Sequence, residues 1–205
     1  VLPQRNPVVL AKQLATIDHL TEGRLELGVG VGWLEEEFEA IGVPFTRRGA
    51  RMDEYIKSMR ALWDQHDASF DGEFVSFNNM NCSPKPYNGR VPIIIGGHSP
   101  KAARRAALLG DGFFPATGTQ TDISPIIEIM HEEAKKIDRD PKTIELTTGC
   151  PGALPGSKVN PLSAVEERVA AGVNRIALPV NAFMDNIEEQ LASFSESVIQ
   201  KINGL

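Results

Sequence analysis

The residues best suited to chemistry lie in the stretch Gly96-Gly97-His98-Ser99-Pro100. Glycines let a backbone approach a bound molecule closely, because no side chain intervenes. Ser99 followed by Pro100 is typical of a helix N-cap and first turn, and the free N–H groups of a helix N-terminus attract an anion. A phosphate or a carbonyl oxygen of a cofactor would suit this position. A plain strand-to-helix turn accounts for the same residues about equally well.

Two side chains near such a site could move a proton. The ordinary pKa of histidine lies near neutrality, so His98 could donate a hydrogen bond to a substrate oxyanion or transfer a proton, or simply pack beside a cofactor. Glu36 belongs to an acidic run, residues 35–37, that is typical of a solvated first helical turn. Of the three, Glu36 is spaced to face a pocket, because it follows Trp33 by three residues.

A second glycine series precedes Trp33. Gly28, Gly30 and Gly32 alternate in L-E-L-G-V-G-V-G and leave one face of a strand at 25–31 nearly bare. Such a face suits close packing inside a barrel or against a flat ligand. The third glycine is misplaced for the dinucleotide fingerprint. Trp33 at the strand end could stack on a ring or cover the core, and the core is the favoured interpretation.

Strands and helices alternate along the chain, and this alternation must position the candidate residues. We expect strands at 25–31, 92–95, 110–114, 143–148 and 175–180. We expect helices at 7–20, 34–41, 47–65, 99–109, 123–139, 161–171 and 187–203. Their predicted N-caps include Asn6, Ser99, Asn160 and either Asp185 or Asn186, and the helix at 47–65 has the clearest amphipathic pattern. The spacings suit right-handed parallel crossovers. Periodicity allows either a five-stranded doubly wound sheet or five-eighths of an eightfold β/α barrel.

One interval is longer than the others. Residues 68–77 alternate around Asp71-Gly72, a favoured two-residue hairpin turn, and a turn-rich stretch follows up to Val91. We therefore expect a single domain over residues 1–205 with an inserted hairpin and loop lobe at about 66–90, beside the barrel mouth.

Composition excludes several classes of protein. The chain has 205 residues, 41% hydrophobic and 23% charged, and a formal net charge of -6 without a basic cluster, which argues against a nucleic-acid partner. No apolar run reaches membrane-spanning length. The four histidines and the two cysteines, Cys82 and Cys150, are too scattered for a metal site. Reduced thiols and no export leader predict a cytoplasmic protein.

An ordered set of motifs resembles the luciferase-like monooxygenase superfamily. The set comprises the stretch from Arg5 to Trp33, then R-R-G-A-R-M-D-E-Y, F-D-G-E-F, P-K-P, I-I-I-G-G-H-S-P and G-D-G-F. It is most similar to the deazaflavin branch, which uses coenzyme F-420. The resemblance implies an eightfold β/α (TIM) barrel with an inserted lobe, a homodimer in the cytoplasm, and deazaflavin or FMN at the C-terminal mouth. By this comparison residues 1–3 end the third strand, so we expect roughly the first three strands to precede this chain.

The resemblance also implies roles for individual residues. It places the backbone of Gly96, Gly97 and Ser99 against the cofactor, with His98 at its edge. The other residues that it implies at the cofactor are Gly30, Gly32, Trp33, Ala116, Thr117 and Gly118. A sugar-phosphate dehydrogenase relative carries a proton-transferring glutamate where Trp33 stands and an asparagine where Glu36 stands, so this chain departs from that activity.

The implied chemistry is hydride transfer between carbon 5 of the deazaflavin and a small organic substrate such as an enone, imine or alcohol. With FMN instead, monooxygenation becomes possible. A flavin-binding barrel relative without turnover is the third interpretation. No metal is implied by any of the three.

Overall fold

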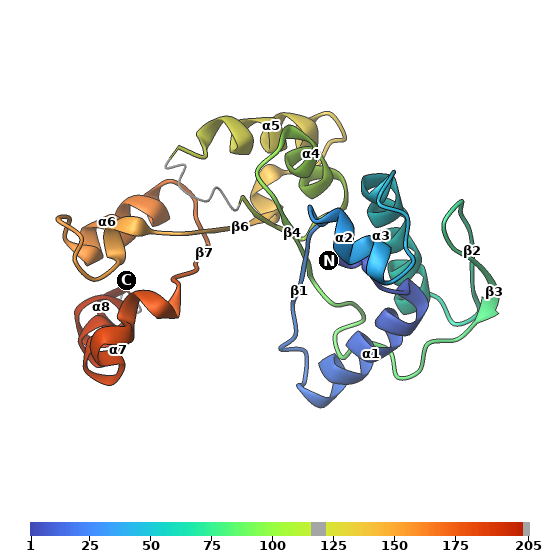
Figure 1. Cartoon of the computed structure of the whole chain (residues 1–205), viewed down its shortest axis with the longest axis horizontal. Coiled ribbons are helices and arrows are strands. Elements are labelled where there is room, and N and C mark those ends of the chain that lie inside the picture. The colour runs from blue at the N-terminus through green and yellow to red at the C-terminus, as the bar shows by residue number, and fades with distance from the viewer. Residues whose placement is uncertain (116–121, 203–205) are drawn as a thin grey trace.

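A single parallel sheet organises the structure, a computed structural model that describes residues 1–115 and 122–202. The five strands are ordered β1-β4-β5-β6-β7, the same as their order in the chain (Figure 1). They are β1 (Leu27–Val29), β4 (Ile93–Gly96), β5 (Gly112–Phe114), β6 (Glu145–Thr148) and β7 (Arg175–Ile176). A doubly wound sheet reverses its strand order at a switch point, whereas a β/α barrel keeps chain order. The observed order is therefore that of a barrel, and in the described residues β1 and β7 do not pair, which leaves the sheet open.

Strand register divides the sheet into two unlike faces. Gly28 lies beside Ile94, Ile94 beside Gly112, and Gly112 beside Glu145, so these residues share the inner face. The opposite face is apolar and covered by helices. Its buried members are Val29, Ile93, Ile95, Phe113 and Leu146. The core thus lies between the sheet and the helices, and few side chains cover the inner face.

The helices of the chain lie mostly within the predicted ranges, and several of them cover the outer face of the sheet. They are α1 (Pro7–Leu20), α2 (Glu35–Ala40), α3 (Arg48–Asp64), α4 (Pro100–Leu109), α5 (Ser124–Lys135), α6 (Pro161–Ala170), α7 (Ile187–Phe194) and α8 (Gln200–Ile202). A π-helical segment, Ser195–Ile199, joins the last two. The side chains of Asn6, Ser99 and Asn160 accept hydrogen bonds from the first turns of α1, α4 and α6, which confirms these predicted caps. The predicted cap at Asp185 or Asn186 is wrong, because Asn186 at the N-cap of α7 makes no side-chain capping bond.

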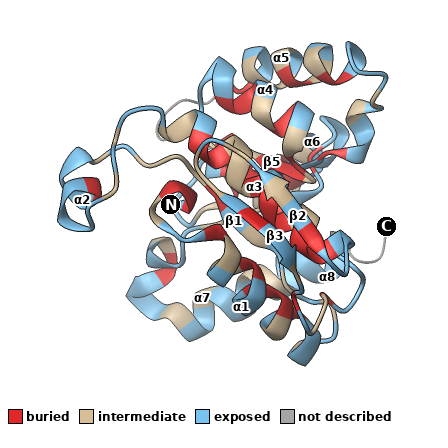
Figure 2. Ribbon diagram, turned by 90° about the vertical axis from the view of Figure 1, so that its right-hand side faces the viewer, coloured by how far each residue is buried: buried red, intermediate tan, exposed pale blue. Residues whose placement is uncertain are grey.

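Helix α3 contributes a large share of the buried residues, and Figure 2 shows how the buried residues, in red, gather between the sheet and the helices. Met52, Ile56, Met59 and Leu62 are buried along one side, as the amphipathic pattern predicts. Trp63 is buried too, and its indole Nε1 donates to the Ala11 carbonyl oxygen at 3.1 Å. That bond satisfies the buried donor and fixes α1 against α3.

The long interval contains an antiparallel hairpin, β2 (Ala68–Asp71) and β3 (Ser76–Met80). Asp71 pairs with Ser76, so the connecting loop is residues 72–75, and the predicted two-residue turn at Asp71-Gly72 is wrong. The physical reason is Glu54 on α3, whose carboxylate binds three amides of this loop. The assignment of residues 66–90 as an inserted lobe of a single domain stays a prediction.

The chain start lies against the free side of β1. The Leu2 amide donates to the Gly30 carbonyl oxygen at 3.1 Å, and the Leu2 side chain is buried. Residues Leu2–Gln4 form a 3-10 helix and not a strand, and this bond links it to the end of β1. Elsewhere, Cys82 and Cys150 are buried free thiols. Among the described helices, none combines the length and apolar character needed to cross a membrane.

Candidate functional site

A cleft of about 700 Å³ opens where β1 and β4 end and where α3 and α4 begin. Parallel α/β structures bind ligands at this carboxyl edge of the strands. Residues of α3, β4 and α4 and of the segments next to them line it, along α4 as far as Leu109: Val31, Arg47, Arg48, Gly49, Ala50, Asp53, Gly96, Gly97, His98, Ser99, Lys101, Ala102, Arg104, Arg105, Leu108 and Leu109. We call this cleft the groove.

The Gly96-Gly97 turn forms one end of the groove. Gly97 has a φ of +138°, and a Cβ there would lie 3.0 Å from the Ala102 Cβ. Both the backbone conformation and the close contact therefore favour glycine at this position. The Gly97 amide donates to the Phe114 carbonyl oxygen at 3.1 Å, which ties the turn to β5. The Ser99 hydroxyl oxygen accepts from the Ala102 amide at 3.2 Å. The turn is therefore rigid, and it aims the start of α4 at the groove.

His98 and Ser99 are both exposed on the groove wall. Their exposure leaves the imidazole accessible to a molecule in the groove. The structure thus brings together Gly96, Gly97, His98 and Ser99, four of the residues that the sequence singles out.

Basic side chains give the groove its charge. Arg47, Arg48, Lys101, Arg104 and Arg105 line it against one acid, Asp53. Arg105 pairs with Asp53, and Arg104 pairs with Glu133 outside the groove. In residues 1–115 and 122–202 no ion-pair partner of Lys101 is found. Cations beside a helix N-terminus favour an anionic ligand.

Arg48 also shapes the end of β1. Its Nε donates to the Gly32 carbonyl oxygen at 3.0 Å, and its guanidinium lies 3.8 Å from the centroid of the Phe45 ring. Gly32 itself has a φ of +79°, and a Cβ there would press on Phe38. Gly32 is therefore required by the turn that leaves β1.

The inner face of β1 is open at the other two glycines. A Cβ built at Gly28 or at Gly30 would meet no atom within 4 Å. The prediction of a bare glycine face is confirmed at Gly28 and Gly30 but is wrong at Gly32, where Phe38 and Val1 fill the space, and the open part provides room for a flat molecule beside the groove.

Trp33 is 82% exposed, so the favoured interpretation that it covers the core is wrong. The turn at Gly32 directs the chain away from the body, and Phe38 takes the buried position on α2. The Phe38 ring packs edge-on against Phe45, with centroids 5.3 Å apart. Figure 2 shows α2 standing off the body on an extended segment.

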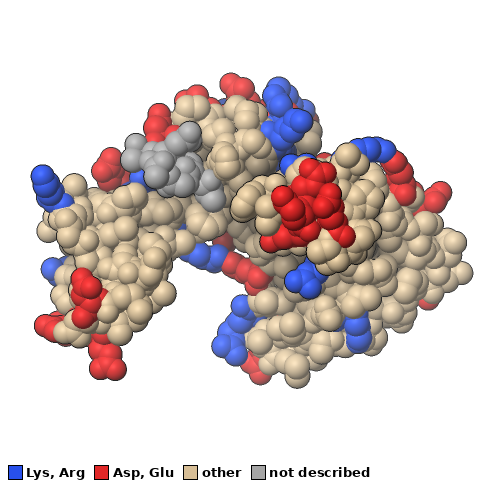
Figure 3. Space-filling view, in the orientation of Figure 1, with Lys and Arg blue, Asp and Glu red and all other residues tan. Residues whose placement is uncertain are grey.

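Glu36 does not line the groove; it lies exposed on α2 with Glu35 and Glu37. These carboxylates form part of an acidic surface (Figure 3). Of the other candidates, Ala116, Thr117 and Gly118 lie outside the described residues.

The cations of the groove were not among the predicted site residues, and the expectation that the chain has no basic cluster is wrong for the folded chain. The signal was nevertheless in the sequence: R-R-G-A-R opens one helix and K-A-A-R-R follows the Ser99 cap in another. First turns of helices that follow parallel strands lie at the same edge of a sheet, so the two basic runs could have been placed together.

Comparison with known proteins identifies the family. The family model for luciferase-like monooxygenase matches residues 1–154. An uncharacterized protein of Mycobacterium tuberculosis is 37% identical over 138 residues, which cover 67% of this chain and 49% of the relative. An FMNH2-dependent dimethylsulfone monooxygenase of Pseudomonas fluorescens is 42% identical over 111 residues, 53% of this chain and 30% of the relative. The chain thus spans about half the length, or less, of the curated relatives it matches.

Solved structures show the same fold. The coenzyme F-420-dependent tetrahydromethanopterin reductase of Methanopyrus kandleri superposes with a TM-score of 0.78 at 14% identity, covering 96% of this chain and 80% of that one. An F-420-dependent secondary alcohol dehydrogenase superposes with a TM-score of 0.59 at 25% identity, covering 70% and 44%. The chain therefore shares the fold of these two enzymes. With the family model matching most of its length, this chain belongs to the luciferase-like monooxygenase family of oxidoreductases.

Proposed function

We propose that this chain provides the cofactor site of a coenzyme F-420-dependent oxidoreductase, which transfers hydride between the deazaflavin and a small organic substrate. The observation that carries the proposal is the basic groove that begins at the Gly96-Gly97 turn, beside the bare glycine face of β1. The choice of deazaflavin rests on the sequence resemblance over residues 6–32 and at Gly96-Gly97.

The residues present fit a phosphate-bearing flavin or deazaflavin. Pro100 has no N–H, and the amides of Ala102 and Ala103 donate to Ser99, so the Lys101 amide, with the side chains of Lys101 and Arg48 nearby, would bind the phosphate. Gly28 and Gly30 would leave room for the ring system. When bound, the deazaflavin would supply the hydride-carrying carbon. Luciferase-like relatives act on small molecules, and we propose the same here, for a homodimer in the cytoplasm.

His98 has the best position among the described candidates to hold or move a proton. It is exposed on the groove wall next to Gly97, where its imidazole can reach a substrate oxygen. Glu36 belongs to the exposed surface of α2, so in this proposal it has a role only if α2 moves toward the groove. Trp33 is exposed and does not line the groove, so in this proposal it contacts the cofactor only if its segment moves toward the groove.

A second candidate function is supported by the 42% identity to an FMNH2-dependent monooxygenase. FMN also carries a phosphate, so the groove fits it by the same argument. A flavin-binding relative without turnover remains the third candidate, and assays of hydride transfer in the presence of bound cofactor would separate it from the first two.

Fluorescence titration with coenzyme F-420 and with FMN tests the assignment. We expect tighter binding of coenzyme F-420. Tighter binding of FMN would replace the deazaflavin assignment by the monooxygenase one. Lack of binding to either cofactor would remove the proposal.

A further inference from the structure

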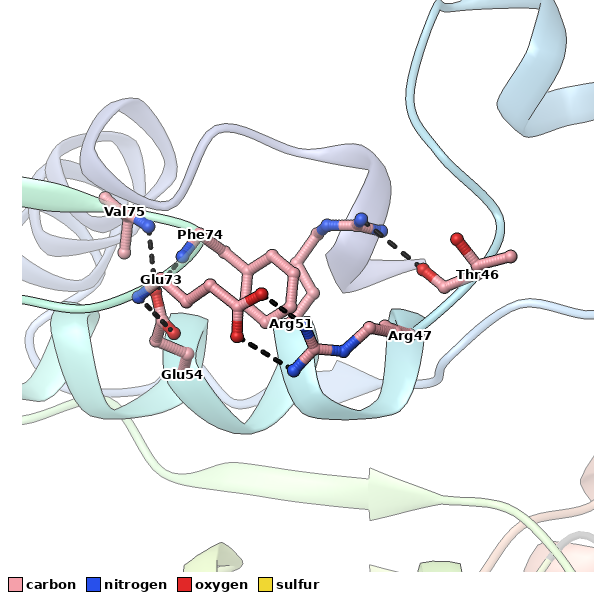
Figure 4. Close-up of polar contacts among 7 residues, drawn as sticks. All are labelled: Thr46, Arg47, Arg51, Glu54, Glu73, Phe74 and Val75. Atoms are coloured by element: carbon pink, nitrogen blue, oxygen red, sulfur yellow. Dashed lines mark hydrogen bonds and ion pairs between the residues drawn. The ribbon is translucent and has the colours of Figure 1, made fainter.

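The hairpin loop, residues 72–75, is held on α3 by a single carboxylate (Figure 4). Glu54 accepts hydrogen bonds from the amides of Glu73, Phe74 and Val75 at 3.0, 2.6 and 2.7 Å. A carboxylate that accepts several N–H groups makes strong, charge-assisted hydrogen bonds. The loop therefore has a fixed position relative to the first turns of α3.

The Phe74 ring adds a second attachment. The guanidinium carbons of Arg47 and Arg51 lie 5.1 and 5.0 Å from its centroid. Arg51 is itself buried, and it donates to the Pro44 carbonyl oxygen at 2.7 Å. The ring thus packs against one anchored cation, Arg51, and one exposed cation, Arg47.

These attachments place the Glu73 carboxylate at Arg47. The two side chains form a side-on ion pair, with Arg47 Nη2 2.8 Å from Glu73 Oε2 (Figure 4). Arg47 also lines the groove. Its φ of +58° is uncommon for a residue other than glycine, so the backbone carries a conformational cost at the point from which this side chain projects. Arg47 therefore stands between the hairpin loop and the groove.

We propose that Glu73 competes with a bound anion for Arg47, and so sets the affinity of the groove and couples its occupancy to the hairpin loop. This inference rests on the proposed function, in which the phosphate of the cofactor is the anion. The pair can be exchanged cheaply, because its side chains are 58% and 57% exposed and such surface pairs are weak. Arginine binds phosphate through two parallel N–H groups, as it binds a carboxylate. Water can solvate the released Glu73.

Calorimetric titration with inorganic phosphate, on the 205-residue chain, provides the test. Glu73→Gln removes the competitor, so phosphate should bind roughly two- to five-fold more tightly, the range expected for an exposed pair. The matched control is Glu35→Gln, which removes the same charge from α2, outside the groove. Equal tightening in Glu73→Gln and Glu35→Gln would overturn the proposal, because it would show only a general charge effect.

Arg47→Gly gives the decisive second variant, since glycine accepts the positive φ without strain. In that background Glu73→Gln should leave phosphate affinity unchanged; if the tightening persists, Glu73 does not act through Arg47. Phosphate binding to none of the variants would also overturn the inference. If Glu73→Gln tightens phosphate binding but the protein binds neither F-420 nor FMN, the competition between Glu73 and the anion is supported. The proposed function is then removed.

Discussion

Glu26 and Arg175 form a side-on ion pair although 149 residues separate them in the chain. Arg175 Nη2 lies 2.7 Å from Glu26 Oε1, and it also lies 3.6 Å from a carboxylate oxygen of Glu145. Hydrogen bonding to Glu26 raises the pKa of the Arg175 guanidinium above its ordinary value. Glu26 directly precedes β1 and Arg175 begins β7, so the pair connects the two strands that end the open sheet. Side chains thus bridge two strands that share no backbone pairing in the described residues.

A double-mutant cycle on this pair should measure its contribution. With Glu26→Gln, Arg175→Gln and the double variant, we expect a coupling energy of about 0.5–1 kcal/mol, because the pair is two-pronged but partly exposed. Urea unfolding of the wild type and the three variants gives the four free energies. The Arg104–Glu133 pair, with one contact of 3.4 Å, is the control and should couple less. If the changes in unfolding free energy of the two single variants sum to that of the double variant, the ion pair contributes nothing to stability.

Glu54→Gln should loosen the hairpin loop. The amide side chain keeps one acceptor but loses the charge that three backbone N–H groups share, so we expect a loss of about 1–2 kcal/mol in unfolding free energy. Hydrogen exchange at Phe74 and Val75 should accelerate. Glu39→Gln, on the exposed face of α2, is the control and should leave both quantities nearly unchanged. Slow exchange at both amides in the variant would contradict the assigned role of Glu54.

Gly30→Val should weaken cofactor binding without unfolding the protein. A Cβ at Gly30 meets no atom within 4 Å, so the branched side chain enters only the space assigned to the cofactor ring. Fluorescence titration gives the affinity, and the thermal midpoint reports on folding. Gly97→Val makes a useful contrast, because the φ of +138° and the contact to Ala102 should lower its midpoint as well. If Gly30→Val binds the cofactor with unchanged affinity, the cofactor ring does not lie on the inner face of β1.

His131 on α5 should make the protein less stable in mild acid. Burial, more than the nearby charge of Lys135, lowers its pKa from the ordinary value of 6.5. A lowered pKa in the folded state means that the unfolded chain binds the proton more readily. The stabilising effect of neutral His131 is therefore complete above about pH 6.5 and decreases as pH falls through the lowered pKa. We expect His131→Gln to lose less stability than the wild type between about pH 7.5 and pH 5; parallel curves would contradict this.

The elements that sequence reasoning located well are those whose signals are local. Caps at Asn6, Ser99 and Asn160 depend on neighbouring residues, and the helical periodicity of α3 depends on burial of one side. Periodicity could not choose between a doubly wound sheet and a barrel, because strand order depends on pairing between distant segments. The family resemblance favoured the barrel, and the observed strand order agrees with it.

The features that sequence reasoning missed depend on distant contacts. The hairpin turn is longer than predicted because Glu54, on another element, binds the loop amides. Trp33 is exposed because Phe38 fills the buried position instead. The groove cations come from two helices that are adjacent only in the folded chain, so their convergence required the strand order as well as the sequence.

The two tryptophans occupy opposite environments, since Trp33 is 82% exposed and Trp63 is 2% exposed. Their intrinsic emission therefore divides into two components within one molecule. Trp33 should emit at longer wavelength and be quenched by iodide, whereas Trp63, shielded in the core and hydrogen-bonded to Ala11, should emit at shorter wavelength until the chain unfolds. A change in the surroundings of Trp33, at the end of β1, can thus be distinguished from global unfolding by intrinsic fluorescence, without attaching a dye.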